Sequence, residues 1–316
     1  MSRQIRPYDN AAISEAAAII LAGGIVAVPT ETVYGLAADA TDADAVARIY
    51  AAKGRPSFNP LIVHVADLAA AERIAVFDTD ARVLAEAFWP GPLTLVLPVR
   101  REAGIASLVT AGLDTIAIRV PHHRAMQALI AATARPLAAP SANASGAISP
   151  TRAAHVAASL GERVSMIIDD GACPAGVEST IVAGRAILRP GPISTVEISR
   201  VLGMPIERLA AGPRPLLASG EPVTAPGQLL SHYAPSKPLR LNADARRDSE
   251  YFIGFGSVEG DENLSVRGDM VEAAANLFDS LHRADASSHA RIAVAPIPET
   301  GIGAAIADRL ARAAHR

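Results

Sequence analysis

The sequence predicts an α/β protein with two domains. Short runs rich in β-branched residues alternate along the chain with segments of helical periodicity, which is typical of mixed α/β folds. The chain has 316 residues, and a domain commonly takes about 150, so we expect two hydrophobic cores. Half of the residues are hydrophobic and 19% are charged, a balance that excludes a disordered or fibrous protein.

The first predicted elements are a helix, a strand and a polar turn. The helix is expected over residues 10–22, with Asn10 as its N-cap and two glycines at 23–24 as the left-handed turn that ends it. A buried strand at residues 25–28 follows directly. Residues 29–32 then form a turn rich in hydroxyl groups at the carboxyl end of that strand, where open α/β sheets favour ligand sites.

The rest of the first 210 residues alternates between helices and strands. Further strands are predicted at residues 61–65, 93–97, 115–120, 165–168, 179–182 and 186–188, and helices at 43–52, 81–88 and 123–133. His122 and His123 follow a proline and are interpreted as the cap of the helix at 123–133, without a chemical role.

Residues 211–238 differ in composition from the sequence on either side. They are rich in proline and glycine with little periodicity, which predicts an extended linker between a domain at 1–210 and a domain at 239–316. The second domain has strand patterns at 251–255 and 291–295, and helix patterns near 270–283 and 302–314. This alternation predicts a small α/β domain with a parallel sheet.

The composition excludes several classes of protein. A net charge of −3 argues against stable, bulk binding of nucleic acid. Cys173 is the only cysteine, which excludes an internal disulfide and a cysteine-built zinc site. The longest apolar run has 13 residues, whereas a membrane helix needs about 18 to 20, and no signal-peptide pattern is found. We therefore expect a cytoplasmic protein with no membrane partner.

A cationic cluster follows the helix predicted at 43–52. Lys53 and Arg55 lie in one loop with a glycine between them, and Asn59 follows within reach. Only two of the 29 basic residues are lysines, so Lys53 stands out as a compact ammonium group. Such a cluster suits an anionic ligand such as a phosphate, although a solvated basic loop is the alternative.

Short polar side chains gather after two other strands. Ser141, Asn143 and Ser149 follow an apolar strand and suit ribose or phosphate oxygens, although turn formation and a helix cap at Ser149 or Thr151 explain them almost as well. Glu178, Ser179 and Thr180 place further polar groups at a strand edge, where ordinary strand residues are the alternative. His64 lies in a β-branched run and has a core histidine as its alternative.

Several common motifs are absent from the sequence. There is no Gly-x-Ser-x-Gly elbow, no His-Glu-x-x-His pattern and no Walker motif, so a serine hydrolase, a zinc protease and a P-loop enzyme are not favoured. Glycines at 254 and 256, and at 301 and 303, form only a partial dinucleotide fingerprint. No metal-ligating set of side chains is predicted.

Several ordered motifs together resemble the Sua5/YrdC family. They are PTETVYGL at residues 29–36, KGRP at 53–56, NPL at 59–61, SAN at 141–143 and SHYAP at 231–235. The resemblance covers essentially the whole chain. It implies a YrdC-like domain with a twisted open sheet, followed by a smaller Rossmann-like α/β domain of the Sua5 type.

The resemblance also implies an activity. Family members are nucleotidyltransferases that join L-threonine, bicarbonate or CO2, and ATP into threonylcarbamoyl-AMP and pyrophosphate, with Mg²⁺ bound alongside ATP. The product serves the N6-threonylcarbamoyladenosine modification at position 37 of certain tRNAs, and a separate tRNA threonylcarbamoyl transferase complex uses it downstream.

The family pattern assigns roles to individual residues of this sequence. Lys53 and Arg55 would neutralise phosphate charge as the catalytic residues. The L-threonine site would consist of Thr32, His64, Arg119, Ala139 and Ser179. The ATP site would consist of Arg55, Asn59, Thr115, Ser141, Asn143, Ser149, Arg189 and Tyr233. Because Tyr233 lies in the predicted linker, we expect that segment to fold over the nucleotide as a lid.

Two other functions are compatible with the sequence. A YrdC-like fold with a locally basic face could serve chiefly to bind RNA, and the same pocket could sense a nucleotide without turnover. Salt-dependent RNA affinity without ATP consumption would favour the first, and nucleotide binding without turnover would favour the second.

Overall fold

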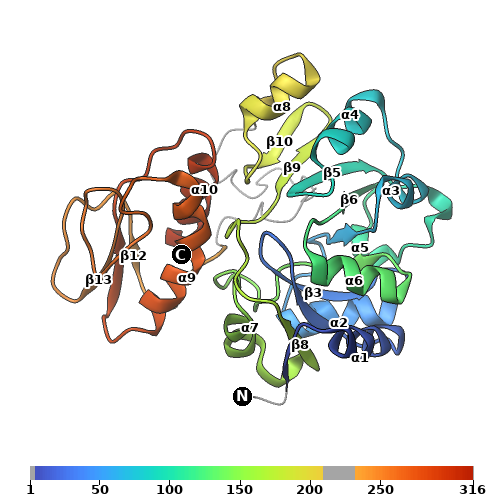
Figure 1. Cartoon of the computed structure of the whole chain (residues 1–316), viewed down its shortest axis with the longest axis horizontal. Coiled ribbons are helices and arrows are strands. Elements are labelled where there is room, and N and C mark those ends of the chain that lie inside the picture. Colours follow the sequence, from blue (N-terminus) through green and yellow to red (C-terminus); the bar gives the residue numbers. More distant parts are fainter. Residues whose placement is uncertain (1–3, 209–231, 316) are drawn as a thin grey trace.

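The computed structural model describes residues 4–208 and 232–315. They form a large lobe (residues 4–208) and a small lobe (residues 232–315), which lie side by side in Figure 1. Of the predicted linker and lid at 211–238, only residues 232–238 belong to the described part, and the remainder lies outside the described residues. None of the helices formed by the described residues has the length and apolar character that a bilayer crossing requires.

The large lobe is built on one twisted mixed sheet. Its strand order is β1-β8-β2-β3-β7-β4-β6-β5-β9-β10-β11. The strands are β1 (Ile5–Pro7), β2 (Val26–Pro29), β3 (Tyr34–Asp39), β4 (Ile62–His64), β5 (Leu93–Pro98), β6 (Thr115–Arg119), β7 (Leu137–Ala138), β8 (Met166–Asp169), β9 (Thr180–Ala183), β10 (Ala186–Arg189) and β11 (Glu207–Arg208).

Helices cover this sheet on both faces. They are α1 (Asn10–Leu21), α2 (Ala43–Lys53), α3 (Leu68–Ile74), α4 (Thr79–Phe88), α5 (Ser107–Thr110), α6 (Arg124–Thr133), α7 (Ala153–Leu160) and α8 (Thr195–Leu202), with short 3₁₀ turns at Arg101–Ala103 and Gly161–Arg163.

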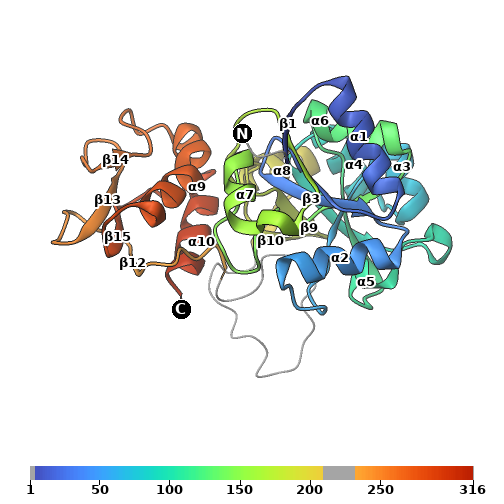
Figure 2. The same cartoon turned by 90° about the horizontal axis from the view of Figure 1, so that it is seen from below.

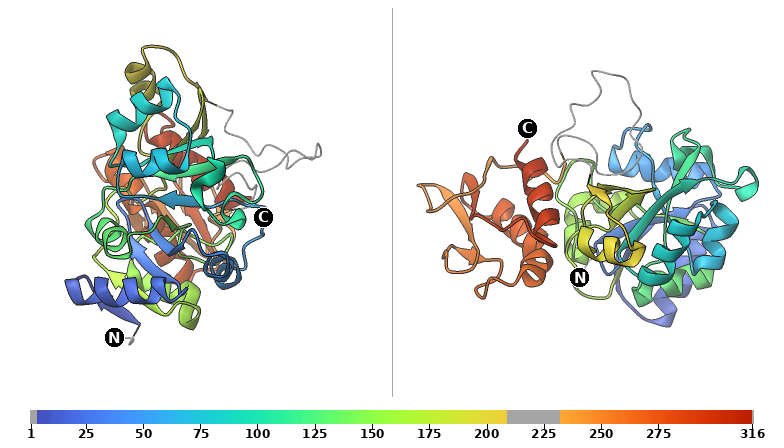
Figure 3. Two further views of the ribbon diagram at one scale, coloured as in Figure 1. Left: turned by 90° about the vertical axis from the view of Figure 1, so that its right-hand side faces the viewer. Right: turned by 90° about the horizontal axis from the view of Figure 1, so that it is seen from above.

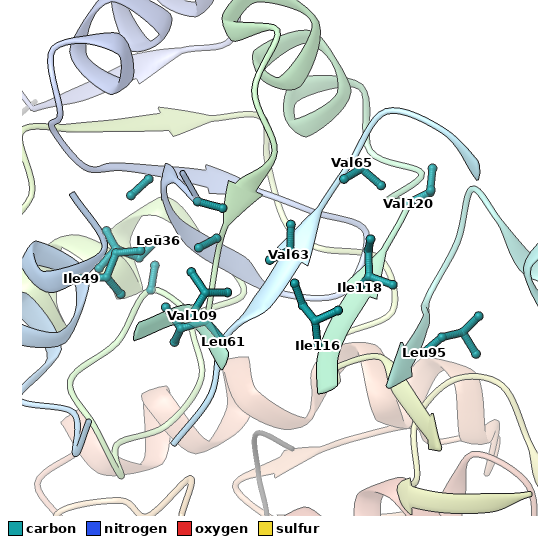
Figure 4. Close-up of a cluster of buried hydrophobic side chains, with 14 of the residues drawn as sticks. Leu36, Ile49, Leu61, Val63, Val65, Leu95, Val109, Ile116, Ile118 and Val120 are labelled. Atoms are coloured by element: carbon teal, nitrogen blue, oxygen red, sulfur yellow. The ribbon is translucent and has the colours of Figure 1, made fainter. Parts of the chain in front are cut away.

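The two cores of the large lobe follow from alternation along the strands. Val26 and Val28 of β2 pack with α1 and α6 on one face, whereas Ala27 packs on the other. Figure 4 shows part of the second core, where Leu36, Ile49 and neighbouring aliphatic side chains meet. This packing makes the sheet a rigid platform for side chains at its strand ends.

The helix ends show where the sequence predictions were right and wrong. The prediction of Asn10 as the first N-cap is wrong, because the Asp9 carboxylate accepts the backbone N–H of Ala12 at 2.7 Å and Asn10 is already helical. His123 caps α6, as predicted, by accepting the N–H of Ala125. The alternative of a side-chain cap at Ser149 or Thr151 is wrong, since α7 has Arg152 at its N-cap and no side-chain cap.

The small lobe has a four-stranded parallel sheet, which confirms the predicted parallel α/β domain. Its order is β12-β15-β13-β14. The strands are β12 (Leu239–Arg240), β13 (Glu250–Gly254), β14 (Glu262–Asn263) and β15 (Arg291–Val294), and the helices are α9 (Met270–Ala286) and α10 (Gly303–Ala314). Both helices lie on the side that faces the large lobe, with the sheet outside them (Figures 1 and 2).

Close backbone packing joins the two lobes, which face each other in the right-hand view of Figure 3. Gly176 of the large lobe has φ +67°, and a Cβ there would lie 2.2 Å from the carbonyl oxygen of Ala274 in α9. The rings of His155 in α7 and His282 in α9 stack with centroids 3.8 Å apart. The small lobe is therefore docked tightly against the segment that precedes β9.

Candidate functional site

A cavity lies on one face of the large sheet, beneath the small lobe. Same-face side chains from adjacent strands form its floor, and the turn after β2 and the start of the small lobe form its walls. Its lining residues are Thr30, Thr32, Val33, Gly35, Arg55, Ile62, His64, Arg119, Ala139, Pro140, Ser141, Glu178, Ser179, Arg189, His232 and Tyr233. Residues from the two predicted ligand sets thus meet in one cavity.

One half of the cavity is rich in hydroxyl groups around Arg119. The Thr30 and Thr32 hydroxyl oxygens lie 2.8 Å apart, and Arg119 donates through Nη1 to Thr32 Oγ1 at 2.9 Å. Arg119 also donates through Nε to the carbonyl of Gly91 and pairs through Nη2 with Glu31 at 2.6 Å. Burial alone would raise the pKa of Glu31, but the guanidinium outweighs burial, so that pKa is lowered.

His64 stands next to Arg119 because β4 and β6 are parallel and in register at these residues. The imidazole is buried. Burial, with the positive charge of Arg119 acting in the same direction, lowers the pKa of His64 to about 3. The ring is therefore neutral near pH 7 and offers hydrogen bonds, not charge, to a ligand.

The other half of the cavity is cationic. Gly54 ends α2 in a left-handed conformation (φ +60°) and turns Arg55 inward, where it donates to the carbonyls of Asn59 and Pro60. Arg189 of β10 donates to the carbonyl and hydroxyl of Ser179. Burial lowers the pKa of Arg55 to about 10, so the group stays charged at neutral pH.

This positive charge is not cancelled by carboxylates in direct contact. Throughout residues 4–208 and 232–315, no carboxylate forms an ion pair with Arg55, Arg189 or Lys53. Glu178, which also lines the cavity, is paired with Arg309. The cationic half therefore has the charge that a polyphosphate would require.

Lys53 lies directly behind the cavity wall and does not line it. Its buried ammonium donates to the carbonyl of Ser141 and to that of Asn143 at 2.5 Å. Burial lowers the pKa of Lys53 well below its usual range, and Arg55 and Arg163 act in the same direction. Lys53 thus holds the loop that presents Ser141 to the cavity.

Replacing Lys53 with methionine should lower both stability and turnover. The loss of hydrogen bonds from a charged donor predicts a decrease of about 1–3 kcal/mol in the free energy of unfolding, and the loosened Ser141 loop predicts at least a tenfold loss of turnover. Lys237 is a matched control, since it donates to the carbonyls of Ala284 and Ser287, and none of these three residues lines the cavity. Equal turnover in the Lys53→Met and Lys237→Met variants would contradict a role for Lys53 at the site.

Not every residue predicted for the nucleotide lines the cavity. Thr115 lies at the opposite end of β6 from Arg119 and pairs with Pro98, so the structure does not bring it to the cavity. The residues predicted at 59, 143 and 149 are buried beside the cavity. There, the carbonyl of Asn59 accepts from Arg55, Asn143 shapes its own loop through Ala144 and Ala147, and Ser149 donates to Glu178.

Seven lining residues were not assigned to a ligand site from the sequence: Thr30, Val33, Gly35, Ile62, Pro140, Glu178 and His232. Glu31, which pairs with Arg119, was also missed. Thr30 and Glu31 lie in the predicted hydroxyl-rich turn, and His232 lies in the SHYAP motif. These two motifs could therefore have indicated all three residues as candidates for the site. Nothing in the sequence indicated that Glu178 would meet an arginine from the other domain.

Buried neutral histidines predict an acid-sensitive fold. The folded pKa is about 3 for His64 and about 4 for His282, where burial is the main cause, against about 6.5 when unfolded. The unfolded chain thus binds more protons below pH 6.5, so the free energy of unfolding should fall between pH 6.5 and 4.5, by about 1.4 kcal/mol per pH unit for each histidine. In denaturation experiments at several pH values, the free energy of unfolding of a His282→Gln variant should depend on pH less steeply, by the equivalent of one bound proton. An unchanged pH dependence would contradict this account.

Two family models match the chain. One, described as "Telomere recombination", matches residues 18–191, and one, described as the C-terminal domain of threonylcarbamoyl-AMP synthase, matches residues 193–315. The threonylcarbamoyl-AMP synthase of Bacillus subtilis is 40% identical over 326 residues, with 96% of this chain and 92% of the relative covered. That of Pyrococcus abyssi is also 40% identical, over 320 residues, with 94% and 92% covered.

A solved structure supports the same relationship. The crystal structure of P. abyssi Sua5 complexed with L-threonine superposes with a TM-score of 0.87 at 38% identity, over 98% of this chain and 96% of that chain. The predicted fold of a twisted-sheet domain followed by a smaller α/β domain is thereby confirmed. Together with the two family models and the full-length relatives, this structure shows that the chain belongs to the Sua5/YrdC family.

Proposed function

We propose that this chain is a threonylcarbamoyl-AMP synthase, which joins L-threonine, bicarbonate and ATP into threonylcarbamoyl-AMP and pyrophosphate. One observation carries the proposal: a cationic half and a hydroxyl-lined half lie next to each other in a single cavity, most of whose lining residues are buried. Relatives that match nearly the whole chain bear this name, and P. abyssi Sua5 was solved with L-threonine.

The hydroxyl-lined half would hold L-threonine. Arg119 has N–H groups beyond those used by Thr32 and Glu31, and its planar guanidinium suits a carboxylate. The neutral ring of His64 and the hydroxyl of Ser179 offer hydrogen bonds to the ligand's polar groups. The floor at Ala139 is apolar and close to Gly35, which leaves room for a small side chain.

The cationic half would hold ATP. Arg55 and Arg189 lie where phosphate groups would be stabilised, and the Ser141 loop is held by Lys53. Tyr233 is fully buried at the cavity and presents an aromatic ring at its edge. We retain Asn59, Asn143 and Ser149 as residues that support this half, and we do not place Thr115 in it because it does not line the cavity.

A metal ion would arrive with the nucleotide. Over the described ranges of the chain, no three or more His, Cys, Asp or Glu side chains gather into a metal site, and Glu31 and Glu178 are each paired with an arginine. Mg²⁺ is commonly held through substrate phosphates with few protein ligands. We therefore propose MgATP as the substrate, with Mg²⁺ supplying charge neutralisation at the phosphates.

The proposed reaction needs positioning more than covalent chemistry. The threonine amine attacks the carbon of CO2 and releases a proton to solvent, or attacks bicarbonate with loss of water, and either route forms a carbamate. A carbamate oxygen then attacks the α-phosphorus, and the bond from that phosphorus to the bridging oxygen breaks as pyrophosphate leaves. Arg119 would fix the amino acid, and Arg55 and Arg189 would stabilise charge that grows on the phosphates. The small lobe, which contributes His232 and Tyr233 to the cavity, would help to shield the adenylate from bulk water.

The test is an assay with each amino acid in turn. Purified protein with ATP, Mg²⁺ and bicarbonate should release pyrophosphate when L-threonine is added, and mass spectrometry should detect threonylcarbamoyl-AMP. Nucleotide binding without threonine-dependent release would instead indicate a sensor, and salt-dependent RNA affinity without ATP consumption would indicate an RNA-binding protein.

The proposal also gives the chain a place in tRNA modification. The product would pass to a separate tRNA threonylcarbamoyl transferase complex in the cytoplasm for the modification at position 37. We propose domain boundaries at residues 210 and 239, with a linker between them whose described end includes Tyr233 at the cavity.

A further inference from the structure

We infer that the small lobe completes the active site through Arg309 of α10, a positioning residue that neutralises Glu178 and fixes the segment carrying Ser179. The inference rests on the proposed function, because the site it completes is the cavity that would hold ATP and L-threonine. It gives the C-terminal domain a defined role in substrate binding.

Arg309 is a fully buried cation that crosses from one lobe to the other. Its Nε donates to Glu178 Oε2 at 2.8 Å, and its Nη1 pairs with Asp308 Oδ2 at 2.8 Å. Its guanidinium carbon lies 5.3 Å from the ring centroid of Tyr233. Burial alone would lower the pKa of Arg309, but Tyr233, Glu178 and Asp308 outweigh burial, and the pKa is raised. Arg309 thus places a buried positive charge against Glu178, which lines the cavity.

Glu178 is the reason that such a cation is needed. Its carboxylate lines the cavity and is buried, with Oε1 accepting the Ser149 hydroxyl and Oε2 accepting from Arg309. Without Arg309, an unpaired negative charge would lie beside Arg189, in the half proposed to bind phosphates. A buried charge that loses its partner is costly, and this one would also repel ATP.

The small lobe holds the same segment at a second point. Gly176 packs against the backbone of α9 so closely that any side chain would overlap Ala274. Val177 belongs to the hydrophobic core of the small lobe, together with Phe278 and Tyr233. Residues 176–178 are thus fixed by α9 and α10, and Ser179, which follows them, accepts hydrogen bonds from Arg189. The position of these lining groups therefore depends on the docked small lobe.

The experiment compares two arginines of the small lobe in the full-length protein. Arg309→Met should raise the dissociation constant for a non-hydrolysable ATP analogue, and the KM for ATP, by at least about tenfold. Arg240→Met is the matched control, because Arg240 forms a bidentate pair with the buried Glu250 inside the small lobe, away from the cavity. That variant should keep both constants within about twofold of the wild type.

Two further variants separate positioning from folding. If Arg309 acts through Glu178, then Arg309→Met added to Glu178→Gln should weaken ATP binding far less than Arg309→Met alone. Arg309→Lys, which keeps the charge, should retain part of the affinity even if Arg309→Met does not fold. Equal losses in Arg309→Met and Arg240→Met, or no rescue by Glu178→Gln, would overturn the inference. Failure of the wild type to release pyrophosphate with threonine would instead overturn the proposed function, since nucleotide binding is measured separately.

Discussion

Replacing Arg55 with methionine should reduce pyrophosphate release by about 10²-fold or more, on the scale of losing one donor that stabilises transition-state charge. Arg55 is buried in the cationic half, held by the carbonyls of Asn59 and Pro60, with no carboxylate of the described residues in ion-pair contact. Its charge is therefore available to the phosphates, where negative charge grows as pyrophosphate leaves. Steady-state kinetics with saturating L-threonine measure the effect.

Arg163 provides the control for this variant. It also donates to backbone carbonyls, those of Ala52 and Leu160, but it does not line the cavity. Arg163→Met should lose stability and keep most of the turnover at a temperature where it is folded. Wild-type pyrophosphate release in Arg55→Met would show that Arg55 has no role in catalysis. Equal losses of turnover in both variants would show only that the substitutions had disturbed the backbone around Arg55.

Local sequence patterns predicted most of the regular elements of the fold. The strand at 61–65 and the helix at 123–133 appear as β4 (Ile62–His64) and α6 (Arg124–Thr133), because β-branched runs and helical periodicity report burial directly. Helices such as α3 and α8 were not predicted. Both are short, with seven and eight residues, and a short helix is stabilised mainly by the surface on which it packs.

The site could be predicted in part, because several of its residues lie in short sequence segments that can be recognised without knowing the fold. Thr32 and Ser141 lie in motifs of the sequence, and Arg119 was assigned from the family pattern; the structure brings all three into one cavity. The ion pair between Glu178 and Arg309 joins residues 131 positions apart, and no pattern within either segment indicates the other. The exact position of Lys53, behind the cavity wall and bonded to two carbonyls, likewise depends on how the loop at 141–143 folds.

Replacing Arg119 with methionine should abolish most L-threonine binding, with kcat/KM for threonine falling by at least about 10²-fold. Arg119 is the guanidinium that lies among the hydroxyl groups of the cavity, 2.9 Å from Thr32 Oγ1, and it is buried. ATP binding should change little, since Arg55 and Arg189 lie in the other half. Kinetics at varied threonine, together with binding of an ATP analogue, measure the two effects separately.

The same substitution should also destabilise the fold, because Glu31 would lose its partner. Removing one member of a buried ion pair costs about 3–5 kcal/mol, and Glu31 is held 2.6 Å from Arg119 Nη2. Glu31→Gln in the Arg119→Met background removes the stranded charge, so it should restore much of the free energy of unfolding without restoring threonine binding. If the double variant regained threonine turnover, Arg119 would serve only to neutralise Glu31, and the assignment of the amino-acid carboxylate to this guanidinium would be wrong.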